Sequence, residues 1–336
     1  MSHETKVPVH PSQALFAGEK ALPVLAPCEH YAGSEKLILK ALELQSDIGP
    51  VFDVTCDCED GAATGEEADH VRMAARLIAS DKNCHGMVGA RIHDPAGPCW
   101  RHDVDTLIGD AGDLLAYLTL PKVSCATDAE SMIRYIRERC AKAGLARTIP
   151  IHVLIETHGA LRDAFQIAAL SDVQVLDFGL MDFVSSHQGA IGFQAMRSPG
   201  QFEHPLLVRA KTEIVAAALA NGLVPSHNVS LSLRDAVATG EDARRARHEF
   251  GFLRMWSVHP GQIRPIVEAM RPAQAEVEEA SEILLAASAA DWGPISVSGE
   301  LHDRATYRYF WHTLQAARSS GATLRGEIVK QFFAEA

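Results

Sequence analysis

Two apolar stretches, IPIHVLIET (149–157) and VQVLDFGLMD (173–182), carry a carboxylate at or near their ends, Glu156 and Asp182. Their central segments, Ile151–Ile155 and Val173–Phe178, are short and rich in β-branched residues, which predicts buried parallel strands. Carboxylates at the C-terminal ends of such strands lie where α/β barrels assemble active sites. Two oxygen ligands on neighbouring strands suit a divalent cation such as Mg²⁺. The alternative is that each carboxylate caps the helix after its strand.

A β-then-α rhythm repeats around these two strands. Amphipathic helices fill the intervals, with Val71, Ala74, Ala75 and Ile78 predicted on one buried stripe and Gly144 predicted to end a helix. Eight alternations favour an α/β fold of the (β/α)₈ TIM-barrel type over a doubly wound sheet. The predicted strands are 22–27, 49–60, 86–93, 113–123, 149–156, 173–179, 222–230 and 252–260.

The pattern changes after Pro272. We predict an N-terminal arm over 1–20, a barrel domain over 21–271 and a C-terminal helical segment over 272–336. This last segment should contain a helix over 275–290, a loop, and a helix from Thr306 to Arg318. It has no place in a barrel, so we interpret it as a lid or a subunit contact. The residues expected to face inward on its first helix are Val277, Ala280, Ile283, Leu284 and Ala287.

Charge and composition narrow the class of protein. The chain has 31 basic and 43 acidic residues and a formal net charge of −12. This balance argues against nucleic acid or an anionic membrane as partner, although a metal and a few arginines can still attract an anionic substrate. Seven scattered cysteines without a Cys-x-x-Cys pair support neither a disulfide framework nor a structural zinc site. Without an apolar span or a signal-peptide pattern, we expect a cytoplasmic protein.

Two further strand ends carry charge. Arg91 ends the third strand, where a guanidinium can bind a carboxylate or stabilise an enolate. A structural ion pair with a nearby carboxylate is its alternative role. Glu59 and Asp60 end the second strand, and because successive strand residues face opposite ways, we expect only one of them to face the barrel interior. That residue would orient Arg91 or a metal-bound water, with capping of the helix near Glu66 as the alternative.

Lys122 and the histidines give weaker signals. Lys122 follows Pro121 at the end of the fourth strand and is either a charge over the pocket or an ordinary surface lysine. His259 ends the eighth strand and has a catalytic or a structural role. His152 alternates within the fifth strand and is interpreted as a hydrogen-bonded core histidine, whereas His158 lies nearer the expected substrate. Asp303, in the C-terminal segment, is a candidate acid or base carried by a lid.

Taken in order, these segments resemble the HpcH/HpaI aldolase/citrate lyase β-subunit family, in its citrate-lyase-like and malyl-CoA-lyase-like branch. The resemblance extends over nearly the whole chain, and no nucleophile elbow or phosphate loop competes with it. The segments that carry it are CEDGA (58–62), ARI (90–92), LPKV (120–123), LIET (154–157), LDFGLMD (176–182), MWSVHPGQI (255–263) and GELHDRATY (299–307).

The resemblance implies a Mg²⁺-dependent carbon–carbon lyase, with Mn²⁺ as a substitute, that acts on a 2-keto or hydroxy acid and a CoA thioester. By matching positions, Glu156 and Asp182 would hold the metal and Arg91 would bind the keto acid. Asp303 would be the acid or base, reaching a neighbouring subunit's site. Glu59 and Asp60 would support the mouth, which is the end of the barrel where the strands have their C-termini. Members of the family commonly form homotrimers or hexamers.

The residues expected to bind the CoA thioester match the family less well than the residues expected to bind the metal. CoA-dependent members usually have Arg-Ser before the first apolar-Pro segment, and this chain has Lys20 and Ala21 there. A class II keto-acid aldolase that needs no CoA therefore remains the alternative enzyme. A non-catalytic barrel that senses a keto acid is the third reading, and retention of Asp303 argues against it.

Overall fold

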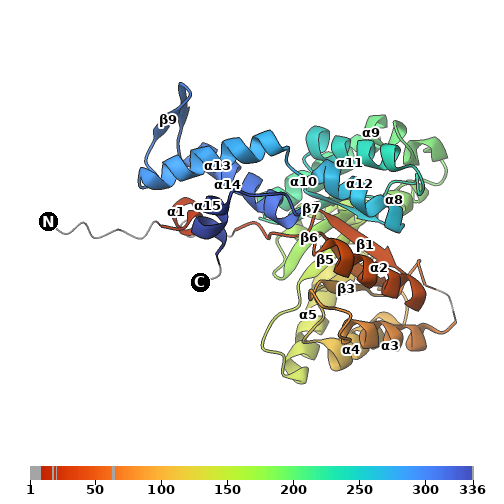
Figure 1. The fold of residues 1–336 in the computed structure, drawn as a ribbon. Helices are drawn as coiled ribbons and strands as arrows, with labels where there is room; N and C mark the ends of the chain where they lie inside the picture. The colour runs from red at the N-terminus through yellow and green to blue at the C-terminus, as the bar shows by residue number, and fades with distance from the viewer. Residues whose placement is uncertain (1–8, 17–18, 20, 63–64, 335–336) are drawn as a thin grey trace. The chain divides into compact units, whose positions relative to one another are not determined.

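The computed structural model describes residues 9–16, 19, 21–62 and 65–334. The chain divides into two compact units. One comprises Leu25–Met270, and the other joins Met1–Val24 to Arg271–Ala336 (Figure 1). Each unit is described separately below.

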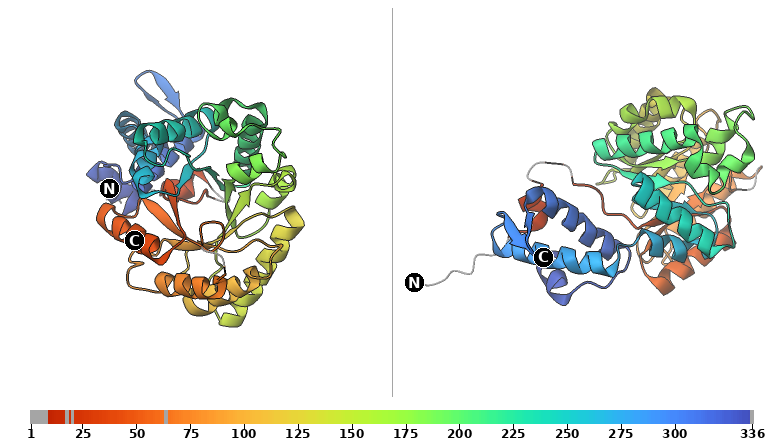
Figure 2. Two further views of the ribbon diagram at one scale, coloured as in Figure 1. Left: turned by 90° about the vertical axis from the view of Figure 1, so that its right-hand side faces the viewer. Right: turned by 90° about the horizontal axis from the view of Figure 1, so that it is seen from above.

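The first unit is a closed barrel of eight parallel strands, each hydrogen-bonded to the next, with β8 returning to β1. Figure 2 (left) shows the strands surrounded by helices. The predicted (β/α)₈ barrel is therefore confirmed. Its strands are β1 Cys28–Ala32, β2 Phe52–Asp57, β3 Val88–Arg91, β4 Leu118–Leu120, β5 Ile151–Ile155, β6 Val173–Phe178, β7 Val224–His227 and β8 Arg254–Ser257.

The position predicted for the first strand is wrong. We predicted it over 22–27, but β1 is the following segment, CEHYA, at Cys28–Ala32. The predicted segment contains Pro23 and Pro27, and proline cannot donate a hydrogen bond to a sheet. The carbonyl of Pro27 nevertheless accepts a bond from Met255 N, so the sheet begins directly after it.

The helices that cover the barrel begin and end at the expected residue types. The Ser34 side chain caps α2, and Gly144, in the left-handed region at φ 73°, ends α5 as predicted. The stripe predicted on α3 is buried. The covering helices are α2 Glu35–Ile48, α3 Glu67–Ile78, α4 Trp100–Ala111, α5 Ala126–Ala143, α6 His158–Arg162, α7 Ala164–Ala168, α8 Leu180–Ser185, α9 Gly200–Glu203, α10 Pro205–Ala220, α11 Ala236–Phe250 and α12 Pro260–Met270, with a 3₁₀ turn η1 at Phe193–Met196.

The inside of the barrel is polar. Barrel interiors are usually filled by branched apolar side chains. Here the apolar core lies mainly between the strands and the helices. Alternate strand residues with polar side chains occupy the inward positions, and they are buried: Glu29, Asp53, Thr55, Thr119, His152, Asp177, Ser226 and Arg254. Contacts between unpaired strands, such as Glu29 of β1 with His152 of β5, cross this interior.

The second unit is built on the helices α13 (Gln274–Ala289) and α14 (Arg304–Ser319). All five residues predicted to face inward on α13 are buried. The segment between these helices is a β-hairpin, β9 Ile295–Val297 and β10 Glu300–His302, rather than the predicted loop. The short elements α15 (Gly326–Ile328) and η2 (Val329–Phe333) complete the C-terminal part.

Residues from the N-terminal end also belong to this second unit. The helix α1 (Pro11–Leu15) places Leu15 in the unit's apolar core. Trp292 Nε1 donates to the carbonyl of Val9 at 2.9 Å, and Arg308 Nε donates to the carbonyl of Leu15 at 3.0 Å. Segments from both ends of the chain therefore share one core.

Candidate active site

The two predicted metal ligands lie at the C-terminal ends of neighbouring strands. Glu156 directly follows β5 and is 2% exposed, and Asp182 lies in the first turn of α8, just after β6. Glu156 Oε1 accepts a hydrogen bond from the backbone N–H of Lys122 at 2.7 Å. Lys122 has a φ of 49°, in the left-handed region, so a strained backbone directs this N–H at the carboxylate.

The electrostatics of this pair suit a cation. Burial, followed by the negative charge of Asp182, raises the pKa of Glu156 to about 8. Among the described residues no group donates a hydrogen bond to the Asp182 carboxylate, whereas Glu156 has one donor for two oxygens. Both carboxylates therefore keep oxygen atoms available. These residues fit a divalent cation bound through oxygen ligands.

Arg91, at the end of β3, is held by two carboxylates. Its Nε and Nη2 donate to the two oxygens of Asp57 at 2.8 and 2.7 Å, and its Nη1 lies 2.9 Å from Glu59 Oε2. Its guanidinium also lies 5.3 Å from the centre of the Tyr31 ring. Burial lowers the pKa of Arg91, but the ion pair with Asp57 outweighs it, so the net pKa lies above its usual range. The structural ion pair that we gave as the alternative exists, and it fixes the guanidinium at the mouth.

Glu59 and Asp60 both contact Lys122, but their side chains are 5% and 58% exposed, so only Glu59 of the two is enclosed. The strand β2 ends at Asp57, so alternation no longer applies at 59 and 60. Lys122 Nζ lies 2.5 Å from Glu59 Oε1 and 2.9 Å from Asp60 Oδ2. The lysine side chain is 25% exposed and belongs to the charged network, so the surface-lysine alternative is wrong.

The two predicted substrate-binding histidines differ in their surroundings. His158 begins α6 and is exposed, and its Nε2 lies 3.1 Å from the Ser186 hydroxyl, close to the end of α8. His259 precedes α12, and its Nδ1 accepts a hydrogen bond from Gly261 N at 3.1 Å. His158 is thus placed near the helix that carries Asp182, whereas the bond of His259 supports its own turn.

Asp303 belongs to the second unit. It caps α14, where its Oδ1 accepts a hydrogen bond from Ala305 N at 2.9 Å, and it is exposed. Its assignment as an acid or base stays a prediction. Lys20, the residue at the expected CoA-binding arginine position, lies outside the described residues.

Sequence reasoning missed two residues of the mouth and misjudged one below it. Asp57 is the bidentate partner of Arg91, and its signal was the spacing of Asp53 and Asp57 on one face of β2. Gly179 lies against Glu156, so that a Cβ there would be 2.3 Å from Glu156 Oε2. His152 is a core histidine as expected, but it is not hydrogen-bonded, because both of its ring nitrogens are buried without a hydrogen-bond partner and Nδ1 lies 3.5 Å from Glu29 Oε2.

The fold and this mouth define a (β/α)₈ barrel with an acidic site at the C-terminal ends of its strands. Residues 47–260 match the HpcH/HpaI aldolase/citrate lyase family, and the chain belongs to that family. It is therefore a carbon–carbon lyase of this family. Among the helices of the described residues, none has the length and apolar character needed to cross a membrane.

Relatives of known structure or function agree with this family. A citrate lyase from Burkholderia xenovorans LB400 is 50% identical, with a TM-score of 0.83, and the match covers 96% of this chain and all of that one. The L-malyl-CoA/β-methylmalyl-CoA lyase of Cereibacter sphaeroides is 27% identical over 70% of this chain and 77% of its own length. CitE of Mycobacterium tuberculosis, solved with magnesium, acetoacetate and coenzyme A, shares the fold at a TM-score of 0.65 and 20% identity over 88% of this chain and 98% of that one.

Proposed function

We propose that this protein is a Mg²⁺-dependent lyase that cleaves or forms a 3-hydroxyacyl-CoA of the citryl or malyl type, giving a 2-keto acid and an acyl thioester. The observation that carries the proposal is the adjacent pair Glu156 and Asp182 beside the buried Arg91. The names of the relatives support it, because the malyl-CoA lyase and the CitE complex both involve CoA compounds.

In the cleavage direction the substrate hydroxyl loses its proton and becomes the carbonyl of the keto acid. The carbon–carbon bond breaks, and its electron pair passes to the thioester as an enolate, which then gains a proton. Glu156 and Asp182 would hold a Mg²⁺ ion, which supplies Lewis-acid stabilisation of the developing charge when bound.

Arg91 would bind the keto-acid end through N–H groups that Asp57 and Glu59 leave unused. Asp57 and Glu59 fix the orientation of the Arg91 guanidinium, so little reorganisation is needed when negative charge develops on the substrate. Lys122 adds a positive charge. Burial lowers its pKa, but the bonds to Glu59 and Asp60 outweigh it and keep the amine protonated. We propose that His158 and His259 line the substrate path and that Asp303 moves the proton.

The test is a turnover screen of the purified protein with Mg²⁺. Citryl-type and malyl-type CoA thioesters are compared with the corresponding free hydroxy acids, and the released keto acid is measured. We expect turnover with a thioester, and none after Glu156→Gln. Turnover with free hydroxy acids alone would instead identify the CoA-independent class II aldolase, and the absence of turnover with both would exclude the proposed function.

We further propose that the chain forms a homotrimer or hexamer in the cytoplasm. The support is the family membership together with the second unit outside the barrel. Sedimentation velocity on the full chain tests the assembly, and a monomer at micromolar concentration would contradict it.

A further inference from the structure

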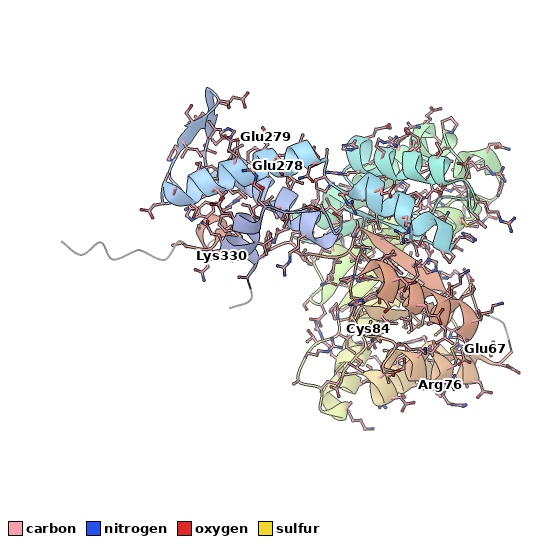
Figure 3. The ribbon with its side chains drawn as sticks, in the orientation of Figure 1. Glu67, Arg76, Cys84, Glu278, Glu279 and Lys330 are labelled. Atoms are coloured by element: carbon pink, nitrogen blue, oxygen red, sulfur yellow. The ribbon has the colours of Figure 1, made fainter. Side chains whose placement is uncertain are left out.

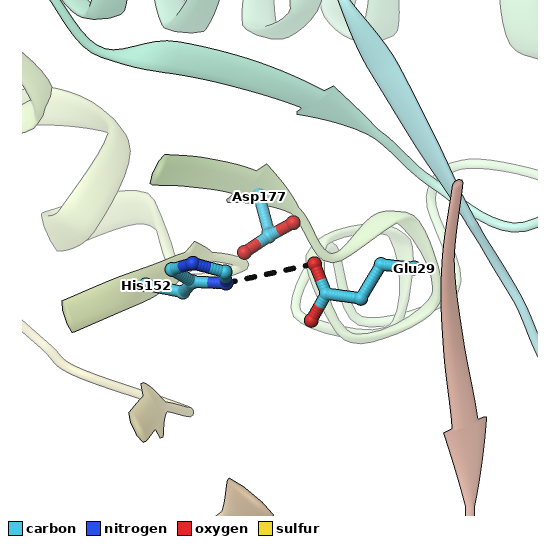
Figure 4. A group of neighbouring side chains, drawn as sticks. All are labelled: Glu29, His152 and Asp177. Atoms are coloured by element: carbon cyan, nitrogen blue, oxygen red, sulfur yellow. Dashed lines mark ion pairs between the residues drawn. The ribbon is translucent and has the colours of Figure 1, made fainter. Parts of the chain in front are cut away.

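Three polar side chains meet inside the barrel, away from the residues assigned above. Glu29, His152 and Asp177 come from β1, β5 and β6, and Figure 4 shows them pointing toward one another. All three are fully buried, and one nitrogen or oxygen atom of each lies within 4.8 Å of the other two. Glu29 Oε2 lies 3.5 Å from His152 Nδ1.

The atoms that face this point lack hydrogen-bond partners. They are Glu29 Oε2, both ring nitrogens of His152 and both carboxylate oxygens of Asp177. Buried polar atoms are nearly always hydrogen-bonded, and leaving one unpaired costs about 1–3 kcal/mol. Glu29 Oε2 has only the longer contacts to His152 Nδ1 at 3.5 Å and to Arg254 Nη2 at 3.6 Å, so the convergence of these atoms from three strands indicates a missing partner that binds all of them.

The charge of the barrel interior identifies the kind of partner. Three buried carboxylates, Asp53, Glu29 and Asp177, face one guanidinium, that of Arg254. Arg254 pairs with Asp53 and lies 3.6 Å from Glu29 Oε2. Burial and the nearby Glu29 raise the pKa of Asp177 well above its usual range. A divalent cation at the centre would balance the two remaining negative charges.

Neighbouring residues already orient the three side chains. The Thr55 hydroxyl donates to Glu29 Oε1 at 2.8 Å, which turns Oε2 toward the centre. The Tyr117 hydroxyl lies 2.7 Å from Thr55 Oγ1, and its ring stacks on that of His152 with centroids 4.0 Å apart. Partners of this kind fix the orientation of metal ligands in metalloproteins.

The cluster uses none of the side chains assigned to the mouth. Along β5 the inward residues are His152, then Leu154, with Glu156 next beyond the strand. Leu154 packs with Tyr31 and Trp256 in a small apolar cluster of its own. Leu154 therefore lies between His152 and Glu156 along β5, at the register position of Asp177 on β6.

We propose that Glu29, His152 and Asp177 form a second, interior metal site for a divalent transition cation such as Zn²⁺ or Mn²⁺. An imidazole with two carboxylates favours these ions over Mg²⁺. Ligand atoms bound at about 2.1 Å can be at most roughly 4.2 Å apart, so the triad must contract slightly around the ion. The enclosed site ties β1 to β5 and β6, and the ion would enter during folding and stabilise the barrel.

The experiment measures metal content after the mouth site has been disabled. Full-length Glu156→Gln protein is gel-filtered in buffer that contains EDTA, and its metal content is then measured by elemental mass spectrometry. We expect about one equivalent of zinc or manganese per chain. Adding Asp177→Asn should lower this content at least tenfold, whereas the matched control Asp172→Asn, a carboxylate just before β6 that pairs with Arg137, should leave it unchanged.

A second measurement does not depend on the folding of the Asp177 variant. Glu156→Gln protein is unfolded in denaturant in the presence of EDTA, and the metal-free chain is then refolded with or without Co²⁺. We expect visible Co²⁺ absorption bands and a higher melting temperature with the metal. Folded protein that is metal-free and shows no Co²⁺ bands would overturn the proposal, and bound protons would then be what balances the buried charges. An equal loss of metal in the Asp172→Asn control would also overturn it. Loss of lyase turnover alone affects the proposed function and not this site.

Discussion

Gly179 lies directly against Glu156, so that a Cβ on Gly179 would fall 2.3 Å from both Cβ and Oε2 of the glutamate. We therefore predict that Gly179→Ala displaces the Glu156 carboxylate and weakens Mg²⁺ binding at least tenfold while the barrel stays folded. Isothermal titration with Mg²⁺ measures the change. Gly109→Ala is the matched control, because a Cβ there meets open space. Equal affinities of the two variants would contradict the prediction.

Mg²⁺ binding should strengthen as the pH rises. The metal must displace the proton that Glu156, with its pKa raised to about 8 by burial and by Asp182, holds at neutral pH. We expect the affinity to increase by up to about tenfold per pH unit between pH 6 and 8, and then to level off. Titration calorimetry at several pH values tests this, and a flat profile in that window would show that the Glu156 carboxyl is already ionised.

The same pKa predicts how the stability of the metal-free protein depends on pH. The folded pKa of Glu156 lies above its unfolded value of about 4.5, so the folded state holds the proton more tightly. Its contribution is fully present below the unfolded pKa and is lost as the pH rises through 8. Urea unfolding in EDTA should give a free energy of unfolding that falls more steeply with pH in the wild type than in Glu156→Gln, by at most about 1.4 kcal/mol per unit.

Arg91→Lys should lower kcat/KM by about 10²–10³-fold, because lysine cannot keep the bidentate bond to Asp57 and also present donors to the substrate. Steady-state kinetics with the substrate found in the screen measure the loss. Arg76→Lys is the control. Arg76, labelled in Figure 3, forms an exposed pair with Glu35 at 2.7 Å, and such pairs contribute little. A loss of the same size in both variants would count against a role for Arg91 at the reacting atoms.

Asp303→Asn separates the proposed proton transfer from helix capping. Asparagine caps helices as well as aspartate does, so the bond to Ala305 N and the melting temperature should be kept. We expect kcat to fall by about 10²-fold or more. Asp303→Ala, by contrast, should also lower the stability of the second unit. Unchanged turnover in Asp303→Asn would remove this residue from the mechanism.

The barrel could be predicted because hydrophobic periodicity marks most of its strands, as in β5 and β6. The first strand failed for a physical reason: its inward positions hold Glu29 and Tyr31, so CEHYA lacks the apolar run expected of a buried strand. Glu156 and Asp182 were predictable because strand ends mark the mouth. The pairing of Arg91 with Asp57 depends on which strands become neighbours in space, which local pattern does not encode.

Leu15 shares a core with residues beyond 271, so the second unit is discontinuous in the chain, with the barrel inserted between its two parts. During synthesis on a ribosome the N-terminal part emerges first and has no partner until the last segment follows. The barrel can complete its own core in that interval. Vectorial synthesis therefore imposes an order on the two units, and a nascent chain stalled after residue 270 should expose α1 to proteases while β1–β8 are already protected.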